Sequence, residues 1–212
     1  RIDHELLERY HEGLICLSAC LAGELPRQIL QDGYEKALET ARFYHSVFGD
    51  DYYIEIQDHG IHNQKQVIPH LARIAQELGA GLVATNDTHY LKKEDAKTQA
   101  VLMCIQTNTV YGQNQAMEFE TDEFYLKSGD EMAEVFSLYP EAVENTVRIA
   151  EQCNFDFEFG MTKLPYFKAP DGRENQEFFE SLCWDGLKQH YGETPDPSLT
   201  KRLEYEIRVI AQ

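Results

Sequence analysis

Three short apolar runs in the first part of the chain each end in polar side chains and then lead into a helical pattern. They are "GLICLSAC" at 13–20, "DYYIEIQDHG" at 51–60 and "GLVATNDTHY" at 81–90. Apolar runs of this length are typical of buried strands, and strands that alternate with helices are typical of parallel sheets. The order strand, helix, strand, helix, strand therefore predicts an α/β fold with helices outside a parallel sheet.

The helices between these runs are predicted from the spacing of their apolar residues. One helical face is formed by Val67, Leu71, Ile74, Ala75 and Leu78. These positions follow the 3.6-residue period of a helix, and Gly79 is a typical helix end. Residues 34–48 show the same period and are followed by Gly49. We therefore expect two amphipathic helices that end at these glycines.

The second half of the chain has a different character. An amphipathic helix is predicted at 140–154 with Pro140 in its first turn, and 155–159 ("FDFEF") alternates like an edge strand. The prolines and glycine of 164–173 predict a linker. Residues 174–212 are typical of two helices separated by "GETPDPS". The expected organisation is a domain at 1–163, the linker, and a mainly helical extension.

The charge balance limits the partners that the chain can bind alone. It carries 19 Lys and Arg against 37 Asp and Glu, a net charge of −18. Proteins that grip duplex DNA without sequence preference present excess positive charge, so we do not expect this piece to do so. Clustered carboxylates are nevertheless good ligands for cations.

The cysteines and the ends of the chain indicate its setting. The 5 cysteines are odd in number and scattered, which argues against a disulfide framework or a zinc finger and favours a reducing, cytoplasmic location. The longest apolar run is too short to span a bilayer, so no membrane association is expected. The chain begins at Arg1 and stops at Gln212 inside a predicted helix, which suggests an excised fragment.

The polar clusters after the three strands are candidates for a metal site. Loops at the carboxyl ends of parallel strands converge, and Asp87 and His89 are two residues apart, so in an extended segment their side chains would project together. An oxygen and a nitrogen ligand suit zinc, manganese or iron. Cys20 would add a thiolate and Glu24 a carboxylate.

Simpler interpretations of the same residues remain open. Asp87 would also suit a turn that caps a following helix. A lone cysteine such as Cys20 is more often a small packing residue than a ligand. Gln57, Asp58 and His59 would also suit a turn held by the glycine that follows them.

Four long stretches resemble the alpha subunits of bacterial DNA polymerase III. They are "GLICLSACLAGELPRQIL", "YYIEIQDHGIHNQKQVIPHLARIAQELG", "LVATNDTHYLKKEDAKTQAVLMCIQTN" and "FEFGMTKLPYF". The resemblance extends over almost the whole chain. It places 1–163 in the latter part of the N-terminal PHP (polymerase and histidinol phosphatase) domain, and 174–212 at the start of the polymerase palm, with "RLEYEIRVIAQ" similar to the palm's first helix.

The resemblance implies a distorted (β/α) barrel of PHP type with divalent metal ions at the carboxyl ends of its strands. Intact members hydrolyse phosphodiesters there as a 3′–5′ proofreading exonuclease. Cys20 matches the cysteine of the family's Leu-Ser-x-Cys stretch, and Asp87 and His89 match its last Asp-x-His motif. These three would bind metal, with Asp87 and His89 catalytic. Glu24, Gln57 and His59 are second-tier candidates near the site.

The chain also lacks features of that family. The His-x-His motif and further ligands lie upstream of Arg1, and the polymerase aspartates lie beyond Gln212. We therefore expect DNA-directed DNA polymerase activity only in the intact parent, with DNA and the other holoenzyme subunits as its partners. For this piece we expect weak or no metal retention and negligible nuclease activity. The alternatives are a metal-free scaffold that stabilises the polymerase and docks a separate exonuclease subunit, and a free-standing phosphoesterase of small molecules.

Overall fold

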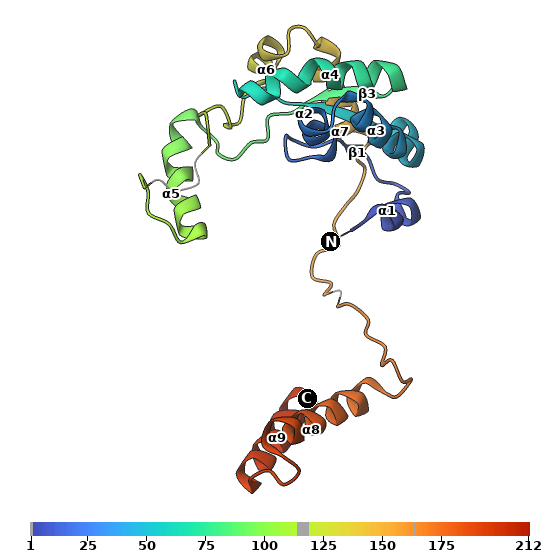
Figure 1. The fold of residues 1–212 in the computed structure, drawn as a ribbon, viewed down its shortest axis with the longest axis vertical. Helices are drawn as coiled ribbons and strands as arrows, with labels where there is room; N and C mark the ends of the chain where they lie inside the picture. The colour runs from blue at the N-terminus through green and yellow to red at the C-terminus, as the bar shows by residue number, and fades with distance from the viewer. Residues whose placement is uncertain (1, 114–118, 163) are drawn as a thin grey trace. The chain divides into compact units, whose positions relative to one another are not determined.

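The computed structural model describes residues 2–113, 119–162 and 164–212 of the chain (Figure 1). The chain divides into two compact units, Arg1–Phe155 and Asp156–Gln212. The limits of the predicted first domain, Arg1 and Lys163, lie outside the described residues.

The first unit contains a parallel sheet of 3 strands in the order β1-β2-β3. The strands are β1 Cys16–Leu17, β2 Tyr52–Ile56 and β3 Gly81–Ala84. Tyr53 of β2 is paired with Leu17 on one side and with Gly81 on the other. The predicted parallel α/β arrangement is therefore confirmed, although β1 is much shorter than the apolar run that predicted it.

Among the helices of the first unit, those at 34–48, 62–78 and 140–152 pack against this sheet. The helices of this unit are α1 His4–Tyr10, α2 Glu24–Gln31, α3 Tyr34–Phe48, α4 His62–Leu78, α5 Ala96–Thr107, α6 Gly129–Val135 and α7 Pro140–Gln152, with 3-10 turns η1 Gly49–Asp51 and η2 Lys93–Asp95. Gly49 and Gly79 follow α3 and α4 with positive φ angles of 56° and 68°. Glycine adopts this region without steric cost, which explains why both helices end where predicted.

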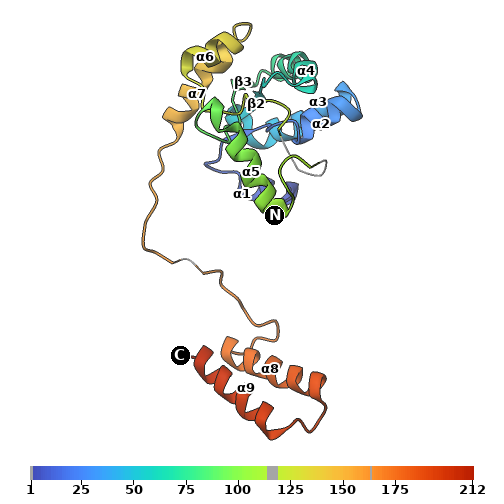
Figure 2. The same ribbon diagram turned by 90° about the vertical axis from the view of Figure 1, so that its left-hand side faces the viewer.

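The core lies around the central strand. Ile54 and Ile56 of β2 and Ile74 of α4 are completely buried, since β2 has a strand on each side and helices packed against it. Helix α7 packs along β3 (Figure 2). The Asn145 amide of α7 donates a hydrogen bond of 2.8 Å to the Leu82 carbonyl. Burying this much apolar surface is the main stabilising contribution in a unit of this kind.

The second unit is a helical hairpin preceded by an irregular stretch. Its helices are α8 Asn175–Tyr191 and α9 Pro197–Ile210, and the Asp196 carboxylate caps α9 by accepting from the Ser198 N–H at 2.8 Å. Both helices were predicted. The prediction of an edge strand at 155–159 was wrong, because these residues form no strand. Alternation of apolar and acidic residues favours a strand only where a neighbouring strand completes the hydrogen-bond ladder.

Candidate functional site at the carboxyl edge of the sheet

The three loops that leave the sheet at its carboxyl edge lie next to one another. The Ser18 N–H donates to the Tyr53 carbonyl at 3.1 Å, and the Thr85 N–H donates to the Ile56 carbonyl at 3.1 Å. These bonds continue the ladder beyond the strands. The polar residues that follow β1, β2 and β3 are therefore brought to one edge, as expected for a parallel sheet.

A buried carboxylate, Glu55 of β2, joins these loops. One oxygen accepts from the Ala19 N–H at 3.0 Å; the other accepts from the Gln57 amide at 3.0 Å and from the Thr85 hydroxyl. The Glu55 side chain thus has partners in the loops after all three strands. A carboxylate is costly to bury unless such bonds compensate for lost hydration, so the loops and Glu55 stabilise one another.

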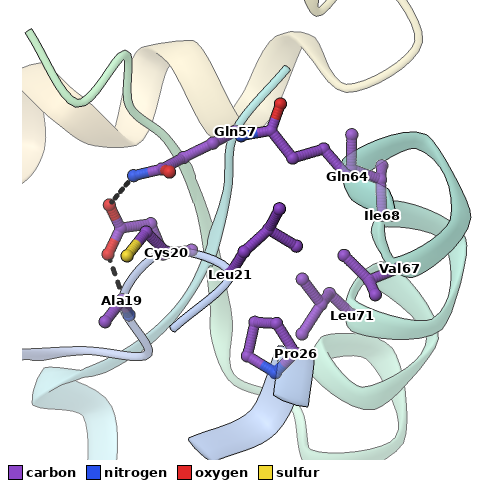
Figure 3. A pocket seen from close by; sticks show the side chains of 10 residues that line it. Ala19, Cys20, Leu21, Pro26, Gln57, Gln64, Val67, Ile68 and Leu71 are labelled. Atoms are coloured by element: carbon purple, nitrogen blue, oxygen red, sulfur yellow. Dashed lines mark hydrogen bonds between the residues drawn. The ribbon is translucent and has the colours of Figure 1, made fainter. Parts of the chain in front are cut away.

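Cys20 lies in a tight turn beside Glu55. Ala19 has a φ of 68°, and the Gly23 N–H closes the turn on the Cys20 carbonyl at 2.8 Å. A Cβ at Gly23 would lie 2.6 Å from the Ser18 carbonyl oxygen, so the turn requires glycine there. Cys20 lines a small cavity with Gln57 and Gln64 (Figure 3).

Gln57 is held in one orientation. Its amide nitrogen donates to Glu55 and, at 3.0 Å, to the Thr85 hydroxyl, so a flipped amide would place its oxygen against the carboxylate. Within the described residues, the Gln57 Oε1 atom is buried and accepts no hydrogen bond. The cavity that it shares with Cys20 has a volume of about 10 Å³, at the lower limit of what one water molecule needs.

His59 is a structural residue. Its side chain is 0% exposed; Gln64 accepts from its backbone N–H at 2.8 Å, which turns the Gln64 amide nitrogen toward Nδ1 at 2.7 Å. Nδ1 must therefore accept, and Nε2 donates to the Asn86 carbonyl at 2.7 Å. Both ring nitrogens are used, so this second-tier candidate has no lone pair left for a metal.

The predicted turn after β2 is also present. The Gly60 N–H donates to the Asp58 carboxylate at 2.8 Å, and Gly60 has a φ of 80°. Asp58 thus serves the turn. The structural interpretation holds for Asp58 and His59, whereas Gln57 faces the cavity beside Cys20.

Asp87 and His89 form a pair at the end of β3. The His89 Nε2 and Asp87 Oδ1 atoms are 3.4 Å apart, and the two side chains are 37% and 38% exposed. The segment is not extended as the sequence suggested, because Asp87 has a φ of 44°. The left-handed residue turns the backbone, and the side chains still meet. The helix-cap interpretation fails, since η2 begins at Lys93 with Lys92 before it.

A segment distant in sequence holds Asn86, the residue that precedes this pair. The amide of Asn86 donates to the backbone carbonyls of Glu123 and Tyr125. The Lys127 side chain is 3% exposed and donates to the Asn86 Oδ1 atom at 3.2 Å while pairing with the Glu123 carboxylate at 3.1 Å. Phe124, which lies between Glu123 and Tyr125 in the sequence, stacks on the His59 ring with the ring centroids 3.9 Å apart. We call residues 123–127 the clamp segment.

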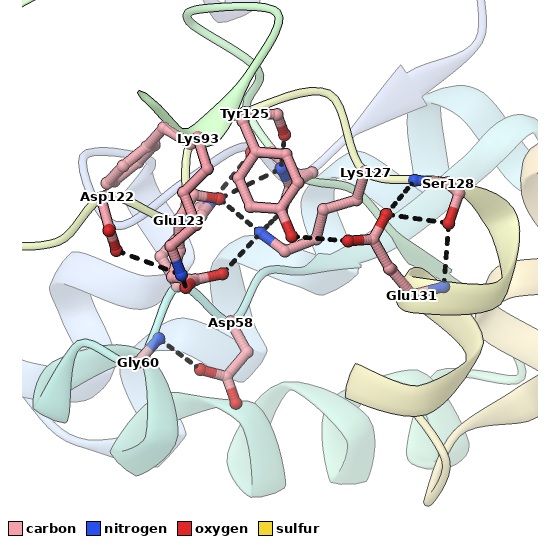
Figure 4. Close-up of polar contacts among 12 residues, drawn as sticks. Asp58, Gly60, Lys93, Asp122, Glu123, Tyr125, Lys127, Ser128 and Glu131 are labelled. Carbon is pink, nitrogen blue, oxygen red and sulfur yellow. Dashed lines mark hydrogen bonds and ion pairs between the residues drawn. The ribbon is translucent and has the colours of Figure 1, made fainter. Parts of the chain in front are cut away.

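Charged contacts support the clamp segment (Figure 4). The hydrogen bond from Lys93 lowers the pKa of the Glu123 carboxyl. The Tyr125 hydroxyl donates to Glu131 at 2.7 Å, and this bond is the main reason that the pKa of Glu131 is lowered to about 2 and that of Tyr125 is raised to about 12. Glu131 also completes a capping box with Ser128 at the start of α6.

Glu24 belongs to a different group of side chains. Its carboxylate accepts from the Tyr44 hydroxyl at 3.0 Å and lies 3.5 Å from the His4 ring. These contacts tie α2 to α3 and α1, and they occupy Glu24 in helix packing.

The candidates therefore do not all come together. In 2–113, 119–162 and 164–212, no three His, Cys, Asp or Glu side chains are grouped so that they could hold a metal ion. Asp87 and His89 present two suitable ligand atoms to solvent, and they fit part of a divalent metal site. Sequence reasoning missed Glu55 and Lys127; the signal for Glu55 was an acidic residue inside an apolar strand.

Comparison with known proteins shows what the chain is similar to. The PHP domain model matches residues 1–59. The chain is 44% identical over 214 residues to DNA polymerase III subunit alpha of Treponema pallidum, covering 100% of the chain and 18% of that relative. The corresponding protein of Borreliella burgdorferi is 42% identical over 99% of the chain and 18% of its own length. That of Campylobacter jejuni is 39% identical over 99% of the chain and 20% of its length.

These matches agree with the fold. The parallel strands with outer helices and the helical extension are consistent with part of a PHP-type barrel. Among the described helices, none is both long and apolar enough to cross a membrane. The chain spans about 18% of the length of the first two curated relatives. Over its whole length the chain is similar to part of DNA polymerase III subunit alpha, and its residues 1–59 match the PHP domain.

Proposed function

We propose that this chain acts as part of a DNA-directed DNA polymerase, with DNA and the other DNA polymerase III holoenzyme subunits as partners of the intact protein. The proposal is supported by 44% identity over the whole chain to a DNA polymerase III subunit alpha. Because the chain spans 18% of that relative, the activity belongs to the intact subunit.

We further propose that Asp87 and His89 are ligands of a divalent metal site, with zinc, manganese or iron as the metal, in a PHP 3′–5′ exonuclease. The observation that carries this is their pairing at 3.4 Å on the carboxyl edge, with both side chains partly open to solvent. A bound cation of this kind lowers the pKa of a water and neutralises charge on a phosphodiester. Cys20, on the loop after β1 at the same edge, is the candidate third ligand, although among the described residues it is not grouped with this pair and would have to approach it.

The protein's own contribution is to hold the ligands in place. Asn86 is fixed through its side chain to the clamp segment, and its carbonyl accepts from His59. Asp87 follows directly, so its backbone is held on one side by these contacts. On the other side, the His89 N–H donates to the Phe124 carbonyl at 2.8 Å. This preorganisation is what a metal site requires of its supporting residues.

The test is the metal content of the full-length subunit, measured by elemental analysis. Asp87→Ala/His89→Ala should lose zinc, manganese or iron that the parent retains. Asp58→Ala is the matched control, because Asp58 lies on the adjacent loop and its carboxylate accepts from the Gly60 N–H in the turn there. Equal metal in the parent and the double variant, or none in the parent, would contradict the metal site.

A second candidate function is a scaffold that docks a separate exonuclease subunit. The net charge of −18 favours this, since an acidic surface suits a protein partner better than a DNA backbone. Co-elution of the full-length subunit with the exonuclease subunit would support docking. Docking that persists in Asp87→Ala/His89→Ala would separate it from metal binding.

A further inference from the structure

Glu55 is an unusual residue for the middle of this sheet. Its neighbours Ile54 and Ile56 are completely buried, and the Glu55 residue itself is 8% exposed. No ion pair reaches Glu55 from the residues that the structure describes; its hydrogen bonds come from uncharged donors. A buried carboxylate without a cation is destabilising unless hydrogen bonds replace its hydration.

The partners of Glu55 are all in the loops of the candidate site. The Ala19 N–H, the Gln57 amide and the Thr85 hydroxyl belong to the segments that follow β1, β2 and β3, respectively. Both carboxylate oxygens therefore already accept hydrogen bonds. A metal bound to Glu55 would have to replace one of these, so the arrangement suits a residue that holds others in place.

The contact with Ala19 has a particular consequence. Ala19 has a φ of 68°, a conformation that is unfavourable for a residue with a Cβ. The bond from its N–H to Glu55, 3.0 Å long, fixes this backbone, and the next residue is Cys20. Within the described residues, no other buried carboxylate accepts a hydrogen bond from this turn. Without Glu55, the strained conformation would lose its charged acceptor.

We infer that Glu55 is a positioning residue that fixes the Ala19–Cys20 turn and so sets where the Cys20 thiol lies. The importance of that thiol rests on the proposed metal site, but the effect of Glu55 on the turn does not. Glu55 acts through Ala19, and Gln57 and Thr85 keep the carboxylate in its rotamer.

The experiment is hydrogen exchange by mass spectrometry on the metal-free full-length subunit, with peptides that resolve the Ala19 amide. A hydrogen bond to a charged group contributes enough that its loss in Glu55→Ala should speed exchange at Ala19 roughly 10- to 100-fold. Glu55→Gln retains an oxygen acceptor and should restore exchange to within about threefold of the parent. Alkylation of the Cys20 thiol can be followed on the same peptides. It should be faster in Glu55→Ala than in the parent, and unchanged in Glu55→Gln.

Asn145→Ala is the matched control. It removes another buried polar side chain that bonds to the sheet, the donor to the Leu82 carbonyl, far in sequence from the turn. It should leave exchange at Ala19 unchanged. The inference is overturned if Glu55→Ala leaves Ala19 exchange unchanged, or if it accelerates exchange no more at Ala19 than in the α4 peptides. If Ala19 responds as expected while Asp87→Ala/His89→Ala retains all metal, the proposed metal site fails and the role of Glu55 stands.

Discussion

Replacing Lys127 by methionine tests whether the clamp segment holds the Asp87–His89 loop. The ammonium makes an ion pair of 3.1 Å with Glu123 and hydrogen bonds to Asn86 Oδ1 and the Glu123 carbonyl. Removing one partner of a buried pair costs about 3–5 kcal/mol, and a hydrogen bond to a charged group contributes about 1.5–3 kcal/mol. Glu123 is 30% exposed and keeps its contact with Lys93. The expected loss of local stability therefore lies near the lower of these values, about 2–3 kcal/mol.

The assay is NMR hydrogen exchange at two amides that join the loop to the clamp segment. The His89 N–H donates to Phe124 and the Leu126 N–H donates to Tyr90. A local loss of about 2–3 kcal/mol corresponds to exchange that is roughly 30- to 150-fold faster. Lys36→Met, which removes an exposed pair with Glu39, should not affect these amides. Exchange within about threefold of the parent in Lys127→Met would refute the role given to the clamp segment.

Two further predictions concern packing and pH. Gly81→Ala should destabilise the chain by about 1–3 kcal/mol in urea unfolding, because its Cβ would lie 2.6 Å from the buried ring of Tyr53. Gly186→Ala, in a helical position with open space, should instead stabilise α8, and a similar loss in both variants would contradict this reasoning. The pKa of Glu131, lowered from 4.5 to about 2, gives a stabilisation that is complete above pH 4.5 and is lost as the pH falls toward 2. Thermal unfolding at several pH values should show this loss, and Tyr125→Phe, which removes the main cause of the lowered pKa, should diminish it.

The sequence predicted the elements that depend on local pattern. The apolar period of α4, the glycines after α3 and α4, and Pro140 at the start of α7 each act within a few residues, so the helix limits were predictable. The parallel sheet followed from the alternation of strands and helices. The strand predicted at 155–159 failed, since alternation alone does not supply a partner strand.

The position of the candidate site at the carboxyl edge of the sheet was predictable from the sequence. The contacts among its side chains were predictable only in part. Asp87 and His89 were expected to meet, although the backbone that brings them together has a left-handed residue that no periodicity indicated. Lys127 and Asn86 are 41 residues apart, so their contact depends on tertiary folding. The role of His59 depends on Gln64 of α4, whose amide orientation is set by the hydrogen bond that it accepts from the His59 backbone N–H.

The bonds around His59 have a consequence for how this sequence can change over time. Gln64 donates to one ring nitrogen, and the Asn86 carbonyl accepts from the other. If a substitution replaced a donor in this set by an acceptor, the buried group bonded to it would lose its hydrogen-bond partner, which is costly. Single substitutions here therefore pass through destabilised intermediates. The Asn86 acceptor is a backbone carbonyl that no substitution removes, so a lineage can exchange this polar set only by paired changes at positions 59 and 64, and these two positions should change together.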